Sequence, residues 1–220
     1  MTREDEYFTE QSKYCYPDTN VLKNKLNIKD SLELEKVERN LTLLRLANLQ
    51  MYGIPNKNFN FSVDYFIEIH RFLFQDLYDF AGKFRTEEIN KFPIMFCVSK
   101  FIYENLNSLM NQMKKQANNI NNEEDLIDYL AYFYGEINAV HPFREGNGRT
   151  LREFLRQVTV YICNLKNLNV EIDYSNIDEI TKKKLMNGSI LSAATKDITL
   201  LQSFFKDVVK EKTLVKDNIK

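Results

Sequence analysis

The sequence predicts a mostly α-helical domain that carries one small β-hairpin. Several segments place apolar residues at helical spacing, and a capping residue precedes most of them. One segment of different pattern, residues 83–98, interrupts them. The chain has 220 residues, of which 44% are apolar, including 16 Phe and 12 Tyr. This length and composition suit a single domain with a sizeable core.

The first part of the chain predicts an irregular arm followed by a long helix. Residues 1–29 are mixed polar and aromatic, with a turn at Tyr16-Pro17-Asp18. From Asp30 the pattern is helical, and Asp30 with Glu33 resembles a capping box. The apolar stripe of this helix is Leu34, Val37, Leu41 and Leu44.

Further helices follow the break at Gly53-Ile54-Pro55. Ser62, Ser99 and Asn122 stand where caps are expected. The inward positions are Val63, Phe66, Ile67, His70, Leu73 and Leu77, then Ile102, Leu106, Leu109 and Met113, then Leu126, Ile127, Leu130 and Ile137, and after Gly148 Leu151, Phe154, Leu155 and Val158. Two more helices are expected over 178–186 and 198–209, separated by Gly188.

The exception is KFRTEEINKFPIMFCV, residues 83–98, which follows Gly82 and contains Pro93. Its β-prone ends flank a polar middle, which predicts a short irregular hairpin. A long hairpin on a helical bundle often covers a site or presents an edge for docking.

Composition excludes several classes of function. The formal charge is −1, from 30 Lys+Arg and 31 Asp+Glu, so the basic excess of a nucleic-acid-binding protein is missing. Cys15, Cys97 and Cys163 lie far apart, which favours reduced thiols in a cytosolic protein. The charged N-terminus has no apolar core, so no signal peptide is expected, and no stretch approaches the roughly 18 apolar residues of a membrane helix.

The most informative stretch is HPFREGNGRTLR, from His141 to Arg152. Gly146-Asn147-Gly148 precedes a helix, and two glycines bring backbone N–H groups close to a ligand. The helix N-terminus adds unpaired N–H groups and a positive dipole end, which favours an anion. Arg149 and Arg152 share one helix face. Together these features suggest a polyphosphate.

Two further side chains of this stretch suggest chemistry. Glu145 would repel a polyphosphate unless a cation lay between them, and Mg²⁺ bound by one carboxylate plus phosphates meets that demand. The imidazole of His141 can accept a proton at neutral pH. Phe143 is expected to anchor the loop in the core. A solvated ion-pair cluster of Glu145 with the arginines is the structural alternative. His70, on an apolar stripe, is interpreted as a packing residue.

The stretch matches the Fic motif H-x-F-x-(D/E)-G-N-G-R-x-x-R at every defined position, and the chain resembles the Fic family. IHRFLFQDLYDFAGKFRT, residues 69–86, resembles the helix that leads into the family's flap, INKFPIMFC the flap, and NVLKNKL, from Asn20, the arm of bacterial toxins and secreted effectors. The resemblance covers about residues 15–208. It implies an arm and first helix over 1–60, a Fic-type helical core over 61–208 with a flap at 84–98, and a tail over 209–220.

The resemblance implies transfer of AMP from Mg-ATP to a Tyr, Thr or Ser hydroxyl of a target protein, by a toxin or effector. His141 would be the general base and Glu145 the Mg²⁺ ligand. The implied ATP-binding residues are Gly146, Asn147, Gly148, Arg149 at the β-phosphate, Arg152 at the γ-phosphate, and Lys91 and Phe92 in the flap. The flap would also pair with the target. The protein would act in the cytoplasm, or in that of a host cell, without contacting nucleic acid or membrane.

Alternatives remain within the fold. Gly148 stands where related Doc kinases carry Lys, which favours nucleotidyl transfer, but UMP, phosphocholine or phosphate are other possible cargoes. A non-catalytic nucleotide-binding module is the rival from another class.

Fic enzymes are typically silenced by a helix with the pattern (S/T)-x-x-x-E-(G/N). Ser31 to Glu35 has the spacing but is followed by Lys36, and Thr213 to Asn218 carries Asp217 in place of Glu. We therefore expect a separate small antitoxin-like inhibitor whose glutamate reaches Arg152.

Overall fold

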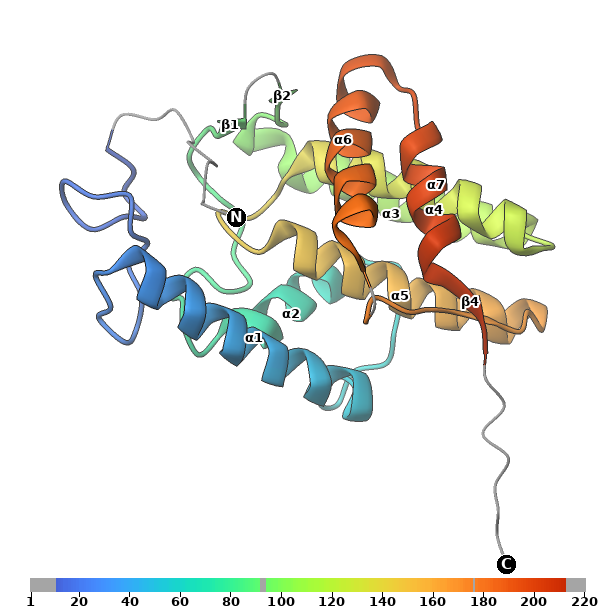
Figure 1. Cartoon of the computed structure of the whole chain (residues 1–220), viewed down its shortest axis with the longest axis horizontal. Coiled ribbons are helices and arrows are strands. Elements are labelled where there is room, and N and C mark those ends of the chain that lie inside the picture. The colour runs from blue at the N-terminus through green and yellow to red at the C-terminus, as the bar shows by residue number, and fades with distance from the viewer. Residues whose placement is uncertain (1–10, 92–93, 176, 213–220) are drawn as a thin grey trace, which may run out of the picture.

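The computed structural model describes residues 11–91, 94–175 and 177–212 (Figure 1). Within these residues, seven α-helices and two small antiparallel sheets follow the irregular arm. The elements are α1 (Ser31–Tyr52), α2 (Val63–Phe74), β1 (Asn90–Lys91), β2 (Ile94–Met95), α3 (Ile102–Gln116), α4 (Glu123–Val140), α5 (Asn147–Lys166), β3 (Val170–Ile172), α6 (Glu179–Thr195), α7 (Thr199–Val208) and β4 (Val209–Glu211), with 3₁₀ turns at Ser99–Phe101 and Ala117–Asn119. The predicted fold class is confirmed.

Local capping explains where most of the helices begin. Asp30, Ser62 and Asn122 each accept a hydrogen bond from the backbone N–H three residues on, as predicted. The prediction for Ser99 is wrong. Its hydroxyl instead donates to Glu88 at 2.6 Å, and a 3₁₀ turn precedes α3.

The core lies between helices that are distant in sequence. Helix α5 packs against α2 and α4, and α4 also packs against α3, α6 and α7, so that α5 runs through the middle of the molecule (Figure 1). The apolar positions predicted for α2 to α5 are buried, with only Ile67 half-buried. This packing holds the ends of α4 and α5 against each other.

The stripe predicted for α1 is partly wrong. Leu44 is 63% exposed, whereas Glu38 and Thr42 are buried. The helix is rotated from the apolar prediction because both polar side chains bond to Arg149 of α5. Leu34 and Leu49 are buried on the same face.

Two expectations near the C-terminal end are also corrected. Gly188 does not separate two helices, because α6 continues through it to Thr195. A Cβ at Gly188 would lie 3.0 Å from the backbone nitrogen of Leu201, so this glycine permits α7 to pack closely. Residues 209–211, expected to belong to a tail, form β4 and pair with β3, with Ile172 opposite Val209. The rest of the expected tail, from residue 213, lies outside the described residues.

The predicted hairpin forms, and its stem packs on the helices. Asn90 pairs with Met95 across β1 and β2. Ile89 and Phe96 are buried against Ile190 and Ala193 of α6, beside which the hairpin lies in Figure 1. No helix among the described residues has the length and apolar content to cross a membrane.

Candidate active site

The motif occupies the tight connection between α4 and α5. His141 follows the last residue of α4 in a left-handed conformation, with φ 45°, and its N–H bonds to the carbonyl of Ile137. Gly146 precedes α5 with φ 80°, a conformation that favours glycine. A Cβ at Gly146 would also overlap the ring of Phe74. The first glycine of the motif is therefore required by conformation and by space.

The orientation of His141 suits a general base. Its Nδ1 lies 3.3 Å from the carbonyl oxygen of Asn138. A carbonyl can only accept, so in the neutral ring Nδ1 carries the proton and Nε2 the lone pair. Phe96 of the flap stem stacks on the imidazole, with centroids 3.9 Å apart and planes at 19°. Phe96 lies in the stretch expected to form the flap, but no pattern along the sequence indicates its contact with His141.

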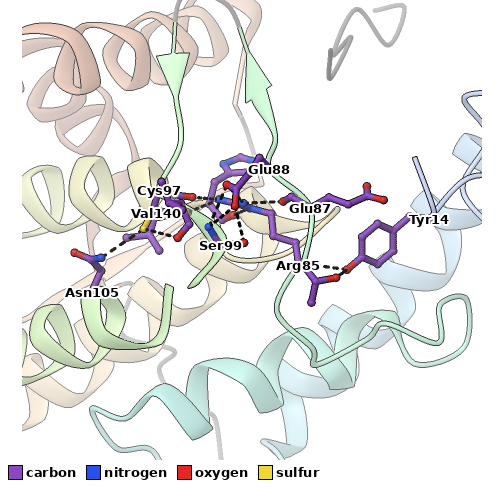
Figure 2. A network of polar contacts seen from close by, with 11 residues as sticks. Tyr14, Arg85, Glu87, Glu88, Cys97, Ser99, Asn105 and Val140 are labelled. Atoms are coloured by element: carbon purple, nitrogen blue, oxygen red, sulfur yellow. Dashed lines mark hydrogen bonds and ion pairs between the residues drawn. The ribbon is translucent and has the colours of Figure 1, made fainter. Parts of the chain in front are cut away.

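The backbone around His141 is held by Arg85, whose side chain is fully buried (Figure 2). Its Nε donates to the carbonyl of His141 at 2.8 Å, and its terminal nitrogens donate to the carbonyls of Cys97 and Glu87. A cation here satisfies carbonyls at the C-terminal end of α4 and complements the helix dipole. Arg85 thus joins both sides of the flap stem to the motif. Sequence reasoning missed it because the partners that join it to the motif are backbone carbonyls, although it also pairs with the Glu88 carboxylate at 3.5 Å.

Other contacts attach the flap stem to its surroundings. The N–H of Cys97 bonds to the carbonyl of Ala139 at 3.0 Å. Glu88 accepts from the hydroxyl of Ser99, and this bond lowers the pKa of that carboxyl despite some desolvation. From the arm, Tyr14 accepts a hydrogen bond from the N–H of Thr86 at 3.1 Å (Figure 2). The flap stem therefore rests on α4 and on the arm.

Phe143 and Asn147 fix the shape of the motif loop. Phe143 is fully buried, as predicted, and stacks on His70 with centroids 3.7 Å apart. The side-chain amide of Asn147 accepts from the N–H of Phe143 and donates to its carbonyl, both at 2.8 Å. Asn147 therefore braces the loop through its side chain. No described side chain caps α5, so the start of this helix remains suited to an anion.

His70 packs in the core as expected, and it also touches the motif. Its Nδ1 accepts from the N–H of Gly82 at 2.8 Å, so Nε2 carries the proton and donates to the carbonyl of Glu145 at 3.0 Å. Burial lowers the pKa of His70 to about 3, and the charge of Arg149 adds to this effect. The residue therefore stays neutral and holds Glu145 in place.

Arg149 is bonded on several sides. It donates to Glu38 at 2.6 Å, to Glu145 at 3.2 Å and to the hydroxyl of Thr42 at 3.2 Å. Burial alone would lower the pKa of Arg149, but the charges of Glu38 and Glu145 outweigh it and hold that pKa above its usual range. The ion-pair alternative thus describes Arg149 and Glu145, although both side chains are half-buried rather than solvated.

Arg152 is in a different situation from Arg149. Within the described residues it forms no ion pair with a carboxylate. It lies near the buried phenol of Tyr134, whose pKa burial raises above its usual range while the charge of Arg152 opposes that shift. A Cβ at Gly148 would lie 3.2 Å from a terminal nitrogen of Arg152. The two motif arginines, alike in sequence, therefore differ in how available their charge is.

The remaining predicted residues are in the flap, and the metal prediction depends on Glu145. Lys91 is the last residue of β1, and its side chain, like Phe92, lies outside the described residues. No group of three or more His, Cys, Asp or Glu side chains that could hold a metal ion occurs in the described part of the chain. A cation held by Glu145 would complete its coordination with oxygens of a bound molecule or of water.

Comparisons with known proteins agree with this geometry. The model of the Fic/DOC family matches residues 60–158. The chain is 34% identical over 180 residues to the probable protein adenylyltransferase y4lH of Sinorhizobium fredii, covering 81% of this chain and 86% of that protein. It is 29% identical over 212 residues to the probable protein adenylyltransferase Fic of Escherichia coli, covering 94% and 96%.

A solved structure shows the same fold. The effector protein BepC of Bartonella tribocorum, crystallised with bound AMPPNP, superposes with a TM-score of 0.76 at 21% identity, covering 91% of this chain and 97% of that one. The sequence identity to the Sinorhizobium relative, the matched motif and the shared fold all indicate the same family. The chain therefore belongs to the Fic/DOC family.

Proposed function

We propose that this protein transfers AMP from ATP to a hydroxyl side chain of another protein. One observation carries the proposal. His141, with Nδ1 bonded to Asn138, lies on the same short loop as the uncapped N-terminus of α5. A proton acceptor and an anion cradle are thus placed together. The names of the relatives, probable protein adenylyltransferases, specify the reaction.

The reaction follows from this placement. Nε2 of His141 accepts the proton of the target hydroxyl, whose oxygen attacks the α-phosphorus. The bond from that phosphorus to the bridging oxygen breaks, pyrophosphate leaves, and AMP remains on the target as a phosphodiester. Backbone N–H groups of Asn147 and Gly148 bind the phosphates, and the N–H of Gly146, which donates to Glu145, holds that carboxylate beside them. Phe96, stacked on the imidazole, limits the rotation of the base.

Glu145 fits the role of a magnesium ligand. Its Oε1 accepts from the N–H of Gly146 and from Arg149, whereas no described residue donates to its Oε2. One carboxylate plus phosphate oxygens is a usual environment for Mg²⁺. When bound, the ion offsets the charge of the phosphates. Arg152, without a carboxylate partner in the described residues, contacts the γ-phosphate. Arg149 was expected at the β-phosphate, but it is bonded to Glu38 and Glu145, so we assign it to the support of Glu145 instead.

The glycine at position 148 supports AMP as the cargo. A lysine there would place a second cation beside Arg152, because even a Cβ would lie 3.2 Å from it. With glycine at position 148, the site favours an arrangement in which the terminal phosphates are bound as the leaving group. UMP, phosphocholine and phosphate are the cargoes that the experiment below must exclude.

The partners follow from the flap and from Arg152. The target presents an extended segment to the β1–β2 hairpin, where Lys91 and Phe92 help to enclose the nucleotide. The protein acts as a toxin or effector, in the cytoplasm of its own cell or of a host. A separate small antitoxin-like protein silences it by placing a glutamate on Arg152. Glu35 does not serve, because on α1 it pairs with Arg39.

The test combines labelled ATP with two variants. Label on the α-phosphate should pass to proteins of a lysate, and label on the γ-phosphate should not. His141→Ala should retain ATP affinity in calorimetry and slow transfer by about 10²–10⁴-fold, whereas Arg152→Ala should weaken ATP binding itself. Transfer of γ-label alone, or equal loss of binding and transfer in His141→Ala, would contradict the proposal.

A further inference from the structure

A carboxylate on α1 is buried where this helix meets Arg149 of α5. The side chain of Glu38 is 5% exposed and lies 111 positions from its partner Arg149 in sequence. It accepts hydrogen bonds from Arg149 and from the hydroxyl of Tyr78. Burying a carboxylate is costly, and a well-packed apolar residue usually stabilises a fold at least as well. This arrangement suggests that the charge of Glu38 has a function.

The geometry around Arg149 shows what that charge does. One terminal nitrogen of Arg149 is shared by two carboxylates, 2.6 Å from Glu38 and 3.2 Å from Glu145. The guanidinium is also fixed by Thr42 and by the ring of Phe74, whose centroid is 4.7 Å away. The shorter and more deeply buried pair is the one with Glu38. Arg149 is therefore held toward α1.

The guanidinium of Arg149 and the carboxylates of Glu38 and Glu145 together carry a charge of −1. Without Glu38 the sum would be zero, and Arg149 would have Glu145 as its single carboxylate partner. A guanidinium and a carboxylate readily form two parallel hydrogen bonds. Such a pair would engage Oε2 of Glu145, to which no described residue now donates a hydrogen bond.

We propose that Glu38 is a positioning residue that keeps Glu145 available to a divalent cation by drawing Arg149 toward α1. The inference rests on the proposed function, in which Glu145 binds Mg²⁺ with the nucleotide. Glu38 touches neither the metal nor the nucleotide and acts through Arg149. Partners of this kind, one shell away from a metal ligand, typically change metal affinity by about 10–100-fold when they are replaced.

The experiment measures binding in a background that cannot turn over. In the His141→Ala protein, ATP affinity is measured by calorimetry across a Mg²⁺ titration and again with EDTA. Glu38→Gln keeps the shape and an acceptor oxygen but removes the charge. It should raise the Mg²⁺ concentration needed for half-maximal tightening by about 10–100-fold. Affinity with EDTA should be unchanged or tighter, because a negative charge near the phosphates is lost.

Control variants separate this effect from others. Glu35→Gln removes a half-buried charge from the same helix, one that pairs with Arg39 and not with Arg149, and should leave the Mg²⁺ dependence unchanged. Glu38→Gln combined with Arg149→Gln removes both charges, so it leaves no unpaired buried ion. The double variant should recover most of the Mg²⁺ dependence, because nothing competes for Glu145. It also serves if the single variant does not fold.

The outcomes are distinguishable. If Glu145→Gln weakens the Mg²⁺ dependence and Glu38→Gln does not, the proposed metal ligand stands and the role of Glu38 is overturned. Equal loss of affinity with and without metal in Glu38→Gln would also overturn it, because Glu38 would only maintain the pocket. If the Mg²⁺ dependence of the double variant is as weak as that of Glu145→Gln, the role of Glu38 is likewise overturned. If Glu145→Gln has no effect, the metal site of the proposed function fails.

Discussion

Replacing His70 should make the folded protein less sensitive to acid. Burial lowers the pKa of this imidazole from 6.5 to about 3, whereas in the unfolded chain it regains its ordinary value. At pH values between about 3 and 6.5, the imidazole of the unfolded chain binds a proton that the folded protein does not bind. The stability contributed by neutral His70 is therefore complete above pH 6.5 and is lost as the pH falls toward 3.

The expected magnitude follows from the same two values. Each pH unit inside this window costs about 1.4 kcal/mol of unfolding free energy. At about pH 4.5 the loss from His70 alone is roughly 2–3 kcal/mol. A domain is usually stable by about 5–15 kcal/mol, so this loss is large enough to measure. Carboxylates also titrate in this range. Their contributions to the pH dependence of the unfolding free energy are the same in the natural protein and in a His70 variant, so they cancel when the two are subtracted.

The assay is urea unfolding, followed by circular dichroism, at several pH values from about 7 to about 4.5. Two variants that do not titrate are compared with the natural protein. In His70→Gln the amide can still donate to the carbonyl of Glu145, and in His70→Asn the oxygen can still accept from Gly82. Each variant leaves one backbone group unsatisfied, at about 1–3 kcal/mol.

Both variants should lose the acid sensitivity assigned to His70, but only the glutamine should support Glu145. We therefore expect His70→Gln to transfer AMP faster than His70→Asn does. If stability fell with pH in parallel for all three proteins, the claim that His70 is buried and neutral would be refuted.

Three other expectations follow. Gly188→Ala should lower the unfolding free energy by about 1–3 kcal/mol, because its Cβ would press on Leu201. The control Asn187→Ala, on the exposed side of the same helix, should leave the unfolding free energy unchanged. Equal urea midpoints for the two variants would contradict the packing role of Gly188. Phe96→Leu should slow AMP transfer by up to about 100-fold without weakening ATP binding in calorimetry, because the imidazole loses the ring that orients it; an unchanged rate would remove Phe96 from the site. Truncation after Lys212, which spares β4, should leave automodification at its full-length level, and a large gain would identify the tail as the inhibitor.

The sequence alone determined the helices and the content of the motif loop. Helix formation depends on periodicity and on caps such as Asp30, Ser62 and Asn122, whose partners lie three residues away. The motif was readable because His141 to Arg152 is one continuous stretch whose glycines, anion-binding helix start and charged side chains act locally. The hairpin was predictable for a similar reason, since Gly82 and Pro93 interrupt the helical pattern.

The tertiary structure decided which groups support this loop. Arg85, His70 and Glu38 act on backbone atoms or charges that lie 56, 75 and 111 positions away, and no spacing along the chain reports such contacts. The same limit explains two wrong predictions. Gly188 was interpreted as a helix break, but close packing of α7 outweighs the low helix propensity of glycine. On α1 the inward face includes Glu38, because a charge that finds its partner on another helix can be buried where periodicity predicts a leucine.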